Sequence, residues 1–175
     1  MKVVVADTSA LISLAMSGQL ALAVKSVSFL VPPRVRQELR EISGYRDREG
    51  RAAKRVLKLV SLGTIQLKVL KGRRRANLLV DKSVDLGEAE CLVLAEEQNT
   101  KTILMDDIRA AYSLHSPAKA QGISLRISAA VVVELVKTGK LTKKKAVHAL
   151  TQMIQRREWE KGVLEHLVSR YLKRM

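Results

Sequence analysis

The sequence has few of the residues that form disulfides or bind metals through sulfur. Its 175 residues include one cysteine, Cys91, which excludes an intramolecular disulfide and a zinc site made of several cysteines. Cys91 begins the apolar run 91–95, so we expect a small buried residue and not a reactive thiol. His115, His148 and His166 lack metal-ligand spacing, and we expect them to be surface or hydrogen-bonded side chains.

Aromatic residues and long apolar runs are also scarce. Aromatics make up 3% of the chain, which argues against a base-stacking platform for sequence-specific single strands. No apolar run has the length of a transmembrane helix, and the N-terminus has a strand pattern in place of a signal peptide. We therefore expect a soluble, cytoplasmic protein that makes no membrane contact.

Acidic residues are outnumbered by basic ones. The 32 Lys and Arg against 17 Asp and Glu give a net charge of +15. A charge-rich, thermophile-like surface is the alternative explanation, but that enrichment usually raises Glu together with Lys. The excess therefore favours an anionic partner, with nucleic acid first, bound mostly through its phosphates.

One basic cluster stands out within this distribution. Lys71, Arg73, Arg74 and Arg75 lie together around Gly72, and we expect them to form a loop. Such a cluster is a candidate RNA contact through phosphates. A solvated loop without a partner is the alternative.

Strand and helix patterns alternate over residues 1–127, which we expect to form an α/β domain. Strands are expected at 3–5, 27–31, 101–105 and 123–127, and the alternating segment 65–70 indicates an edge strand with one wet face. This order predicts a three-layer α/β/α fold with a central parallel sheet. The helix after Asp107 is expected to end near residues 115–117.

Residues 128–175 have the pattern of three helices. Ser128 and Thr142 are candidate N-caps of the first two. We expect this C-terminal helical extension to pack on the same domain.

Acids follow two of the expected strands directly. Asp7 comes after the first strand, and Asp106 and Asp107 come after the strand at 101–105. Thr8 or Ser9 can cap the helix that follows Asp7. Since the carboxyl ends of parallel strands meet at one edge of the sheet, we expect Asp7 and Asp106 to lie close together.

Two helices bring further acids toward the same edge. Glu38 borders the apolar stripe of the helix at 34–43, although a surface glutamate paired with arginine is an alternative reading. Asp85 and Glu88 have capping-box spacing, which is a structural explanation of both. Glu88 also starts the stripe that continues four and seven residues later, whereas Glu90 is expected to point elsewhere.

Four unpaired carboxylates in one crevice would repel one another and raise each other's pKa values. A divalent cation relieves that repulsion. Oxygen ligands without Cys or His select hard ions, Mg²⁺ or Mn²⁺. Such an ion can generate hydroxide and stabilise a phosphodiester during in-line attack.

Four segments of the chain resemble a PIN domain, and more narrowly its VapC-like branch with a Gly-Glu-Ala-Glu motif. The resemblance rests on residues 5–12, 35–39, 86–90 and 103–107, and residues 131–139 also fit that branch. It implies a sheet flanked by helices, Mg²⁺- or Mn²⁺-dependent cleavage of RNA and, in many members, a homodimer. Many members are toxins that an antitoxin neutralises.

The resemblance also implies roles for individual residues. The catalytic and metal-ligating acids would be Asp7, Glu38, Glu88 and Asp106. Glu90 and Asp107 are alternative metal ligands, and Thr8 and Ser9 would support the site by hydrogen bonding. The third family acid is commonly Asp, and Glu88 departs from that pattern.

Three functions remain open at this point. The first is a single-strand-preferring endoribonuclease of the toxin type. The second is an RNA-processing PIN nuclease without an antitoxin. The third is a non-catalytic RNA-binding module whose carboxylates serve only as caps and ion pairs.

Overall fold

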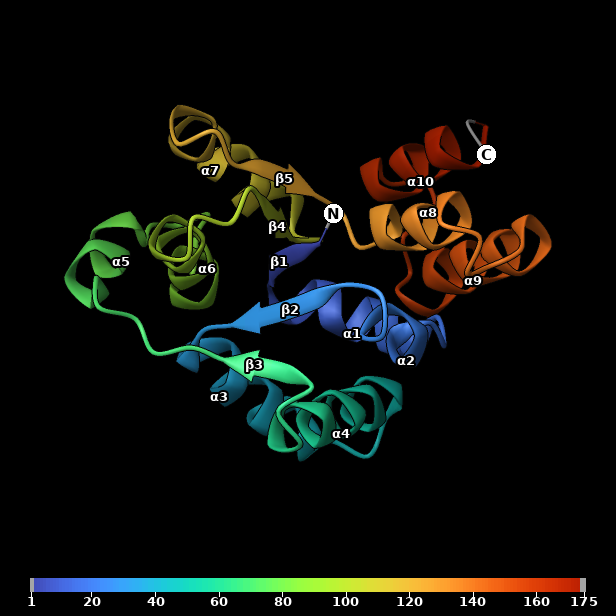
Figure 1. The fold of residues 1–175 in the computed structure, drawn as a ribbon, viewed down its shortest axis with the longest axis horizontal. Coiled ribbons are helices and arrows are strands. Elements are labelled where there is room, and N and C mark those ends of the chain that lie inside the picture. Colours follow the sequence, from blue (N-terminus) through green and yellow to red (C-terminus); the bar gives the residue numbers. More distant parts are fainter. Residues whose placement is uncertain (1, 174–175) are drawn as a thin grey trace.

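The central sheet has five parallel strands in the order β3-β2-β1-β4-β5 (Figure 1). This computed structural model describes residues 2–173. The strands are β1 (Val3–Ala6), β2 (Ser28–Val31), β3 (Ile65–Leu67), β4 (Thr102–Leu104) and β5 (Ser124–Arg126). β1 is central, and β3 is an edge strand as expected. The predicted α/β fold with a parallel sheet is confirmed.

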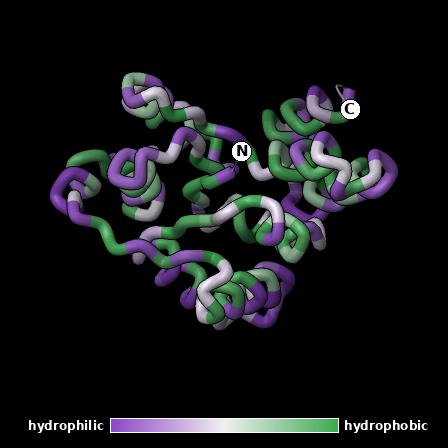
Figure 2. The backbone as a smooth tube through the Cα atoms, viewed as in Figure 1, coloured by the Kyte–Doolittle hydropathy of each residue, from purple (hydrophilic) through white to green (hydrophobic). Residues whose placement is uncertain are grey.

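Helices cover both faces of the sheet. They are α1 (Thr8–Met16), α2 (Leu20–Ala23), α3 (Pro33–Ser43), α4 (Arg48–Ser61), α5 (Arg73–Leu79), α6 (Leu86–Glu97), α7 (Ile108–Ala120), α8 (Ala129–Lys137), α9 (Lys143–Arg156) and α10 (Val163–Lys173). In Figure 1, α5 and α6 lie on one side of the strands, and α1, α2 and α8 to α10 lie on the other. Figure 2 shows β1 and β2 as hydrophobic segments inside a more hydrophilic outer layer.

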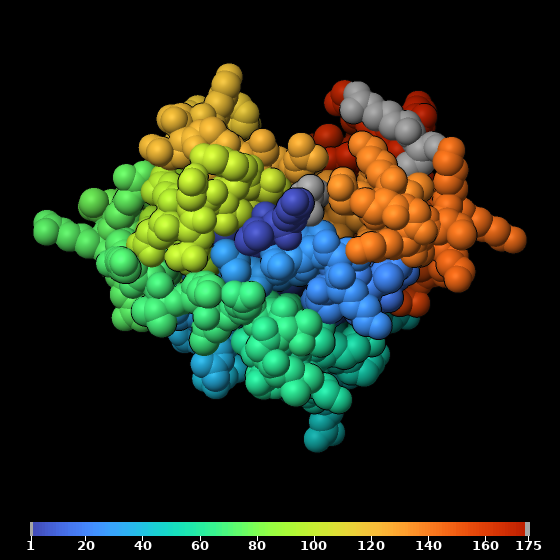
Figure 3. All heavy atoms as spheres, viewed as in Figure 1, coloured from blue at the N-terminus to red at the C-terminus, as the bar shows by residue number. Residues whose placement is uncertain are grey.

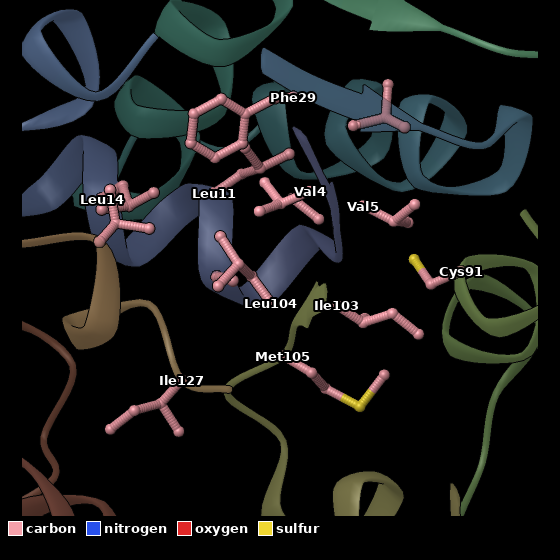
Figure 4. Close-up of a cluster of buried hydrophobic side chains, with 14 of the residues drawn as sticks. Val4, Val5, Leu11, Leu14, Phe29, Cys91, Ile103, Leu104, Met105 and Ile127 are labelled. Atoms are coloured by element: carbon pink, nitrogen blue, oxygen red, sulfur yellow. The ribbon is translucent and has the colours of Figure 1, made fainter. Parts of the chain in front are cut away.

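The core forms on both faces of the central strands because successive side chains point to opposite faces. Val5 and Ile103 face Cys91 of α6, while Val4 and Leu104 lie on the α1 side (Figure 4). All five side chains are fully buried. Cys91 is therefore a packed core residue, as expected from its apolar neighbours.

The C-terminal helices share this core. Val131, Val132 and Leu135 of α8, Leu150 of α9 and Val168 of α10 belong to the same hydrophobic cluster as the strands. One apolar core therefore continues across the junction between residues 127 and 128. In Figure 3, a notch separates the α7 segment from the C-terminal helices at one end of the molecule. No helix within residues 2–173 is long and apolar enough to cross a membrane.

One expected N-cap is wrong, and a second residue, Ser128, stands at the expected N-cap position without a capping bond. Asp7 caps α1 by accepting a hydrogen bond from the Ser9 amide, so neither Thr8 nor Ser9 is the N-cap. Ser128 makes no capping bond to α8, because its hydroxyl and amide both bind the carboxylate of Asp106. The Thr142 cap of α9 and the capping box of Asp85 and Glu88 are confirmed.

Two segments are more helical than expected. Arg73, Arg74 and Arg75 form the first turn of α5 instead of a loop, since residues 73 to 79 include neither Gly nor Pro and most of them are Arg, Ala and Leu, which favour a helix. Helix α7 continues through Pro117 to Ala120. Proline removes only one amide donor near this helix end, and the buried residue Ala118 holds the last turn against the core.

Candidate active site

Seven of the 17 acidic residues line one cavity of about 350 Å³ next to the ends of β1 and β4. We call it the acidic cavity. Its acids come from five separate stretches of the chain: Asp7, Glu38, Glu41, Glu49, Asp85, Glu88 and Asp107. Arg157 is the one cation among the described residues that line it. So many carboxylates at one place are unexpected for a chain with a net charge of +15.

Asp7 is held at the end of β1 by the first turn of α1. Its Oδ2 accepts hydrogen bonds from the Ser9 amide at 3.1 Å and from the Ser9 hydroxyl at 2.6 Å. The same hydroxyl accepts a hydrogen bond from the Asp106 amide at 3.0 Å. Ser9 therefore ties the ends of two adjacent strands together and fixes the Asp7 carboxylate. Hydrogen bonds of this kind were predicted for Ser9, and its role in supporting an active site stays a prediction.

Glu38 is oriented from two sides. The Thr8 hydroxyl donates to its Oε2 at 2.6 Å, and Arg34 Nε donates to its Oε1 at 3.1 Å. The start of α6 approaches the same carboxylate very closely. A Cβ atom on Gly87 would lie 2.6 Å from Oε1 and 2.9 Å from Oε2 of Glu38. Gly87 thus makes room for Glu38, a role that the sequence pattern alone did not reveal.

The two glutamates of the Gly-Glu-Ala-Glu segment have different positions. Glu88 lines the acidic cavity, and its Oε2 accepts the Asp85 amide at 2.8 Å in the capping box. Glu90 is buried and lies outside the described lining of the cavity. Its Oε2 accepts the Arg34 amide at 2.9 Å, so it binds a free N–H in the first turn of α3. The expectation that Glu90 points elsewhere agrees with this contact.

The two adjacent aspartates after β4 also diverge. Asp106 is buried, and its carboxylate accepts the Ser128 amide at 2.8 Å and the Ser128 hydroxyl at 2.7 Å. It does not line the acidic cavity, whereas Asp107 does. Asp107 caps α7 through the amides of Arg109 and Ala110. The structure thus brings Asp7, Glu38, Glu88 and Asp107 to one cavity, while Asp106 faces Ser128.

Burial raises the pKa values of the carboxyl groups in this region. Asp7 reaches a pKa of about 6, and its hydrogen bonds to Ser9 oppose the rise. Burial raises the pKa of Glu38 to about 7, with further increases from the charges of Asp85 and Asp7. Burial raises the pKa of Glu88 to about 8, and the same two charges add to it. Groups that resist ionisation in this way are stabilised by a nearby cation.

These shifts predict that the metal-free protein loses stability as the pH rises. Between about pH 4 and pH 8 the folded state binds more protons than the unfolded state, so unfolding becomes easier with increasing pH. The contribution is complete below the unfolded pKa values and is lost as the pH passes the folded values. Thermal melts in EDTA should show a flatter decline for Glu88→Gln than for the wild type.

An exposed glutamate supplies the control for this measurement. Glu160 is exposed and outside the acidic cavity, so Glu160→Gln should keep the wild-type dependence on pH. Equal slopes for Glu88→Gln and Glu160→Gln would contradict the assignment of the shifts to the cavity.

The donor chemistry of the acidic cavity fits a hard divalent ion. Its acids offer carboxylate oxygens without sulfur or imidazole, which is the ligand set of Mg²⁺ or Mn²⁺. Within residues 2–173, no three Asp, Glu, His or Cys side chains stand in a coordinating arrangement. Asp7, Glu38 and Glu88, which line the cavity, are the residues that would hold an ion.

The basic cluster of Lys71 and Arg73 to Arg75 lies away from this cavity. The amides of Lys71 and Gly72 bind Glu97 at the C-terminal end of α6, while Glu88 is at its N-terminal end. Nine residues of helix separate Glu88 from Glu97, or about 14 Å along the axis. Arg75 also pairs with Glu96 at 2.7 Å. The cluster is therefore not part of the rim of the acidic cavity.

The fold and the cavity define a class: an α/β protein with an acidic site at the carboxyl edge of a parallel sheet. Comparison with family models then gives the particular family, because the PIN domain model matches residues 3–174. The chain belongs to the PIN domain family. PIN domains are generally nucleases, hydrolases that cut phosphodiester bonds. No curated protein and no solved structure gave a significant match to the sequence.

Proposed function

We propose that the chain is a divalent-metal-dependent endoribonuclease that cleaves single-stranded RNA at the acidic cavity. The observation that supports it most is the collection of seven acids around one cavity in a strongly basic chain. Asp7, Glu38 and Glu88 are the proposed metal ligands. Asp107 is the proposed fourth acid, since it lines the acidic cavity and Asp106 does not.

The bound ion, Mg²⁺ or Mn²⁺, would supply Lewis acidity and an activated water for phosphodiester hydrolysis. The protein's own contribution is to orient the ligands and remove them from bulk water. Ser9 holds Asp7, and Thr8 together with Arg34 holds Glu38. Glu90 and Asp106 act as positioning residues, because each binds backbone or side-chain groups that anchor the elements of the site.

Cleavage of a labelled single-stranded RNA tests this proposal. Wild-type protein should cleave with Mn²⁺ or Mg²⁺ and stop in EDTA. Glu88→Gln should reduce the rate at least tenfold, roughly the size seen when groups that support a metal are removed. Glu90→Gln should retain more activity, since an amide oxygen can still accept the Arg34 amide. Cleavage in EDTA, or full activity of Glu88→Gln, would contradict the proposal.

A non-catalytic RNA-binding module is the second candidate. It is supported by the structural hydrogen bond that each central acid already makes, and by the absence of a coordinating triplet within residues 2–173. The module would bind RNA equally as wild type and as Asp7→Asn, and neither form would cleave with either ion. If the chain is a nuclease, the wild type will cleave RNA and Asp7→Asn will not.

We also propose a toxin role in a toxin–antitoxin pair, a homodimer and a cytoplasmic location. These proposals rest on the resemblance of residues 86–90 and 131–139 to the VapC-like branch. An RNA-processing nuclease without an antitoxin is the alternative. Co-purification of a small neutralising protein would favour the toxin, and sedimentation of the purified chain would give its oligomeric state. Lys71 and Arg73 to Arg75 remain a proposed RNA contact remote from the cavity.

A further inference from the structure

A second cavity, of about 470 Å³, is lined almost entirely by arginine and glutamine. Its lining residues are Met16, Arg48, Arg51, Arg55, Gln152, Gln155 and Arg156, with no carboxylate among them. We call it the arginine cavity. Figure 1 shows α1 between α4 and α9, and both of these helices pack on α1. The cavity therefore lies over the C-terminal end of α1, with α4 and α9 as its two walls.

The two walls present matching polar stripes. Arg48, Arg51 and Arg55 are spaced by three and four residues along α4, which places them on one face. Gln152, Gln155 and Arg156 have the same kind of spacing on α9. The arginines and glutamines therefore line the two sides of one groove and are not spread over the surface.

Three of the four guanidinium groups bind backbone carbonyls, and the first of them, Arg51, donates to the carbonyl of Arg46 at 3.1 Å. Arg55 donates to the carbonyl of Ala15 at 3.1 Å, and Arg156 donates to the carbonyl of Met16 at 2.6 Å. Each retains further N–H donors for a ligand. Arg48 occupies the first turn of α4, where a cation opposes the helix dipole, so the stability of α4 does not account for it. An anionic ligand does account for it.

The arginine cavity leads to the acidic cavity. A connecting cavity of about 440 Å³ shares Met16, Arg48, Gln155 and Arg156 with the first and shares Glu49 and Arg157 with the second. Along α4, Glu49 and Arg55 are six residues apart, or about 9 Å. Arg157 pairs with Glu49 at the junction, and its Nε is the buried side-chain donor left without a partner among the described residues.

We propose that the arginine cavity binds the phosphodiester backbone of the RNA strand on one side of the scissile phosphate. This proposal rests on the proposed function, because the RNA strand is taken to run from the arginine cavity to the acidic cavity, where cleavage would occur. Arginine forks match phosphate oxygens in geometry and charge. No aromatic side chain lines the groove, so it contacts backbone and carries no base preference.

Binding in EDTA tests this groove without requiring cleavage. The probe is a fluorescein-labelled oligouridylate, titrated by anisotropy at several salt concentrations. Arg48→Gln/Arg51→Gln should weaken binding roughly tenfold and lower the salt slope by about 1.4, at about 0.7 per phosphate contact of a single strand. Both arginines are exposed, so the double variant should keep the wild-type melting temperature. The single variant Arg51→Gln should show about half the change in slope.

The control removes the same charge elsewhere. Arg126 and Arg170 are exposed and line none of the three cavities, so Arg126→Gln/Arg170→Gln should bind within about twofold of wild type. Equal losses in both double variants, an unchanged salt slope or no binding by the wild type would overturn the groove. Loss of binding only in the groove variant, with no metal-dependent cleavage by the wild type, would support the groove and refute the nuclease.

Discussion

Replacing Asp7 with asparagine is expected to abolish metal-dependent RNA cleavage and, in EDTA above neutral pH, to raise the melting temperature. Both the loss of activity and the gain in stability follow from removal of the same carboxylate, which would bind the metal ion but is costly to bury when it is ionised. Burial raises the pKa of Asp7 to about 6, so its ionised form destabilises the metal-free fold above that pH. Asparagine has no charge to bury, and its carbonyl oxygen can still accept the two hydrogen bonds from Ser9.

The activity should fall by at least about a hundredfold, since a proposed metal ligand is lost together with its charge. Mn²⁺ should raise the melting temperature of the wild type and leave Asp7→Asn unchanged, because only a protein that binds the ion is stabilised by it. Melting curves with and without Mn²⁺, together with a cleavage assay, measure both effects.

Asp81→Asn is the matched control. Asp81 is exposed and also accepts backbone amides, from Ser83 and Val84, but it lies outside the acidic cavity. It should change neither cleavage nor the response to Mn²⁺. If Asp7→Asn cleaved RNA like the wild type, Asp7 would be an N-cap of α1 and nothing more.

The strand pattern alone was sufficient to bring Asp7 and the acids after β4 to the same region. Parallel pairing of β1 with β4 forces the ends of both strands to one edge, and the two apolar segments specified that pairing. Glu38 and Glu88 could also be placed from sequence, because each lies on the boundary of an apolar helical stripe. These are local patterns whose outcome depends little on the rest of the fold.

The choice between adjacent acids could not be made from sequence. Asp106 and Asp107 differ by one position, and their fates depend on Ser128, which follows a different strand. Glu88 and Glu90 are separated only because Glu90 meets the first turn of α3. In both pairs, contacts between distant segments determine which acid lines the cavity. Composition and periodicity carry no information about such contacts.

The arginine cavity was missed for the same reason. Its residues looked like ordinary polar faces of two helices, one near residue 50 and the other near residue 155. Their meeting depends on both helices packing against α1. The basic cluster of Lys71 and Arg73 to Arg75 was predicted as an RNA contact because it is contiguous in sequence. It lies at the other end of α6 from the acidic cavity.

Gly87→Ala is expected to reduce cleavage strongly while leaving the fold intact. Gly87 lies in the first turn of α6 with an ordinary backbone conformation, and alanine there favours the helix by up to about 1 kcal/mol. The added methyl would lie 2.6 Å from Glu38 Oε1. Glu38 is the flexible partner, so it must leave its bonds to Thr8 and Arg34. The melting temperature should stay near that of the wild type, and the rate should fall at least tenfold.

A double-mutant cycle isolates the route of this effect. If Gly87→Ala acts by displacing Glu38, then Glu38→Gln/Gly87→Ala should be no slower than Glu38→Gln alone, because the two changes remove one interaction. Gly44→Ala is the control. Its added Cβ would meet only the backbone carbonyl of Glu41, at 3.3 Å, so it adds a methyl group at the end of α3 without touching the Glu38 carboxylate. If the double variant cleaves more slowly than Glu38→Gln by the full factor that Gly87→Ala shows alone, Gly87 matters for another reason, such as direct access of RNA to α6. Such a result would also remove the structural argument that Glu38 must occupy its present place for the site to work.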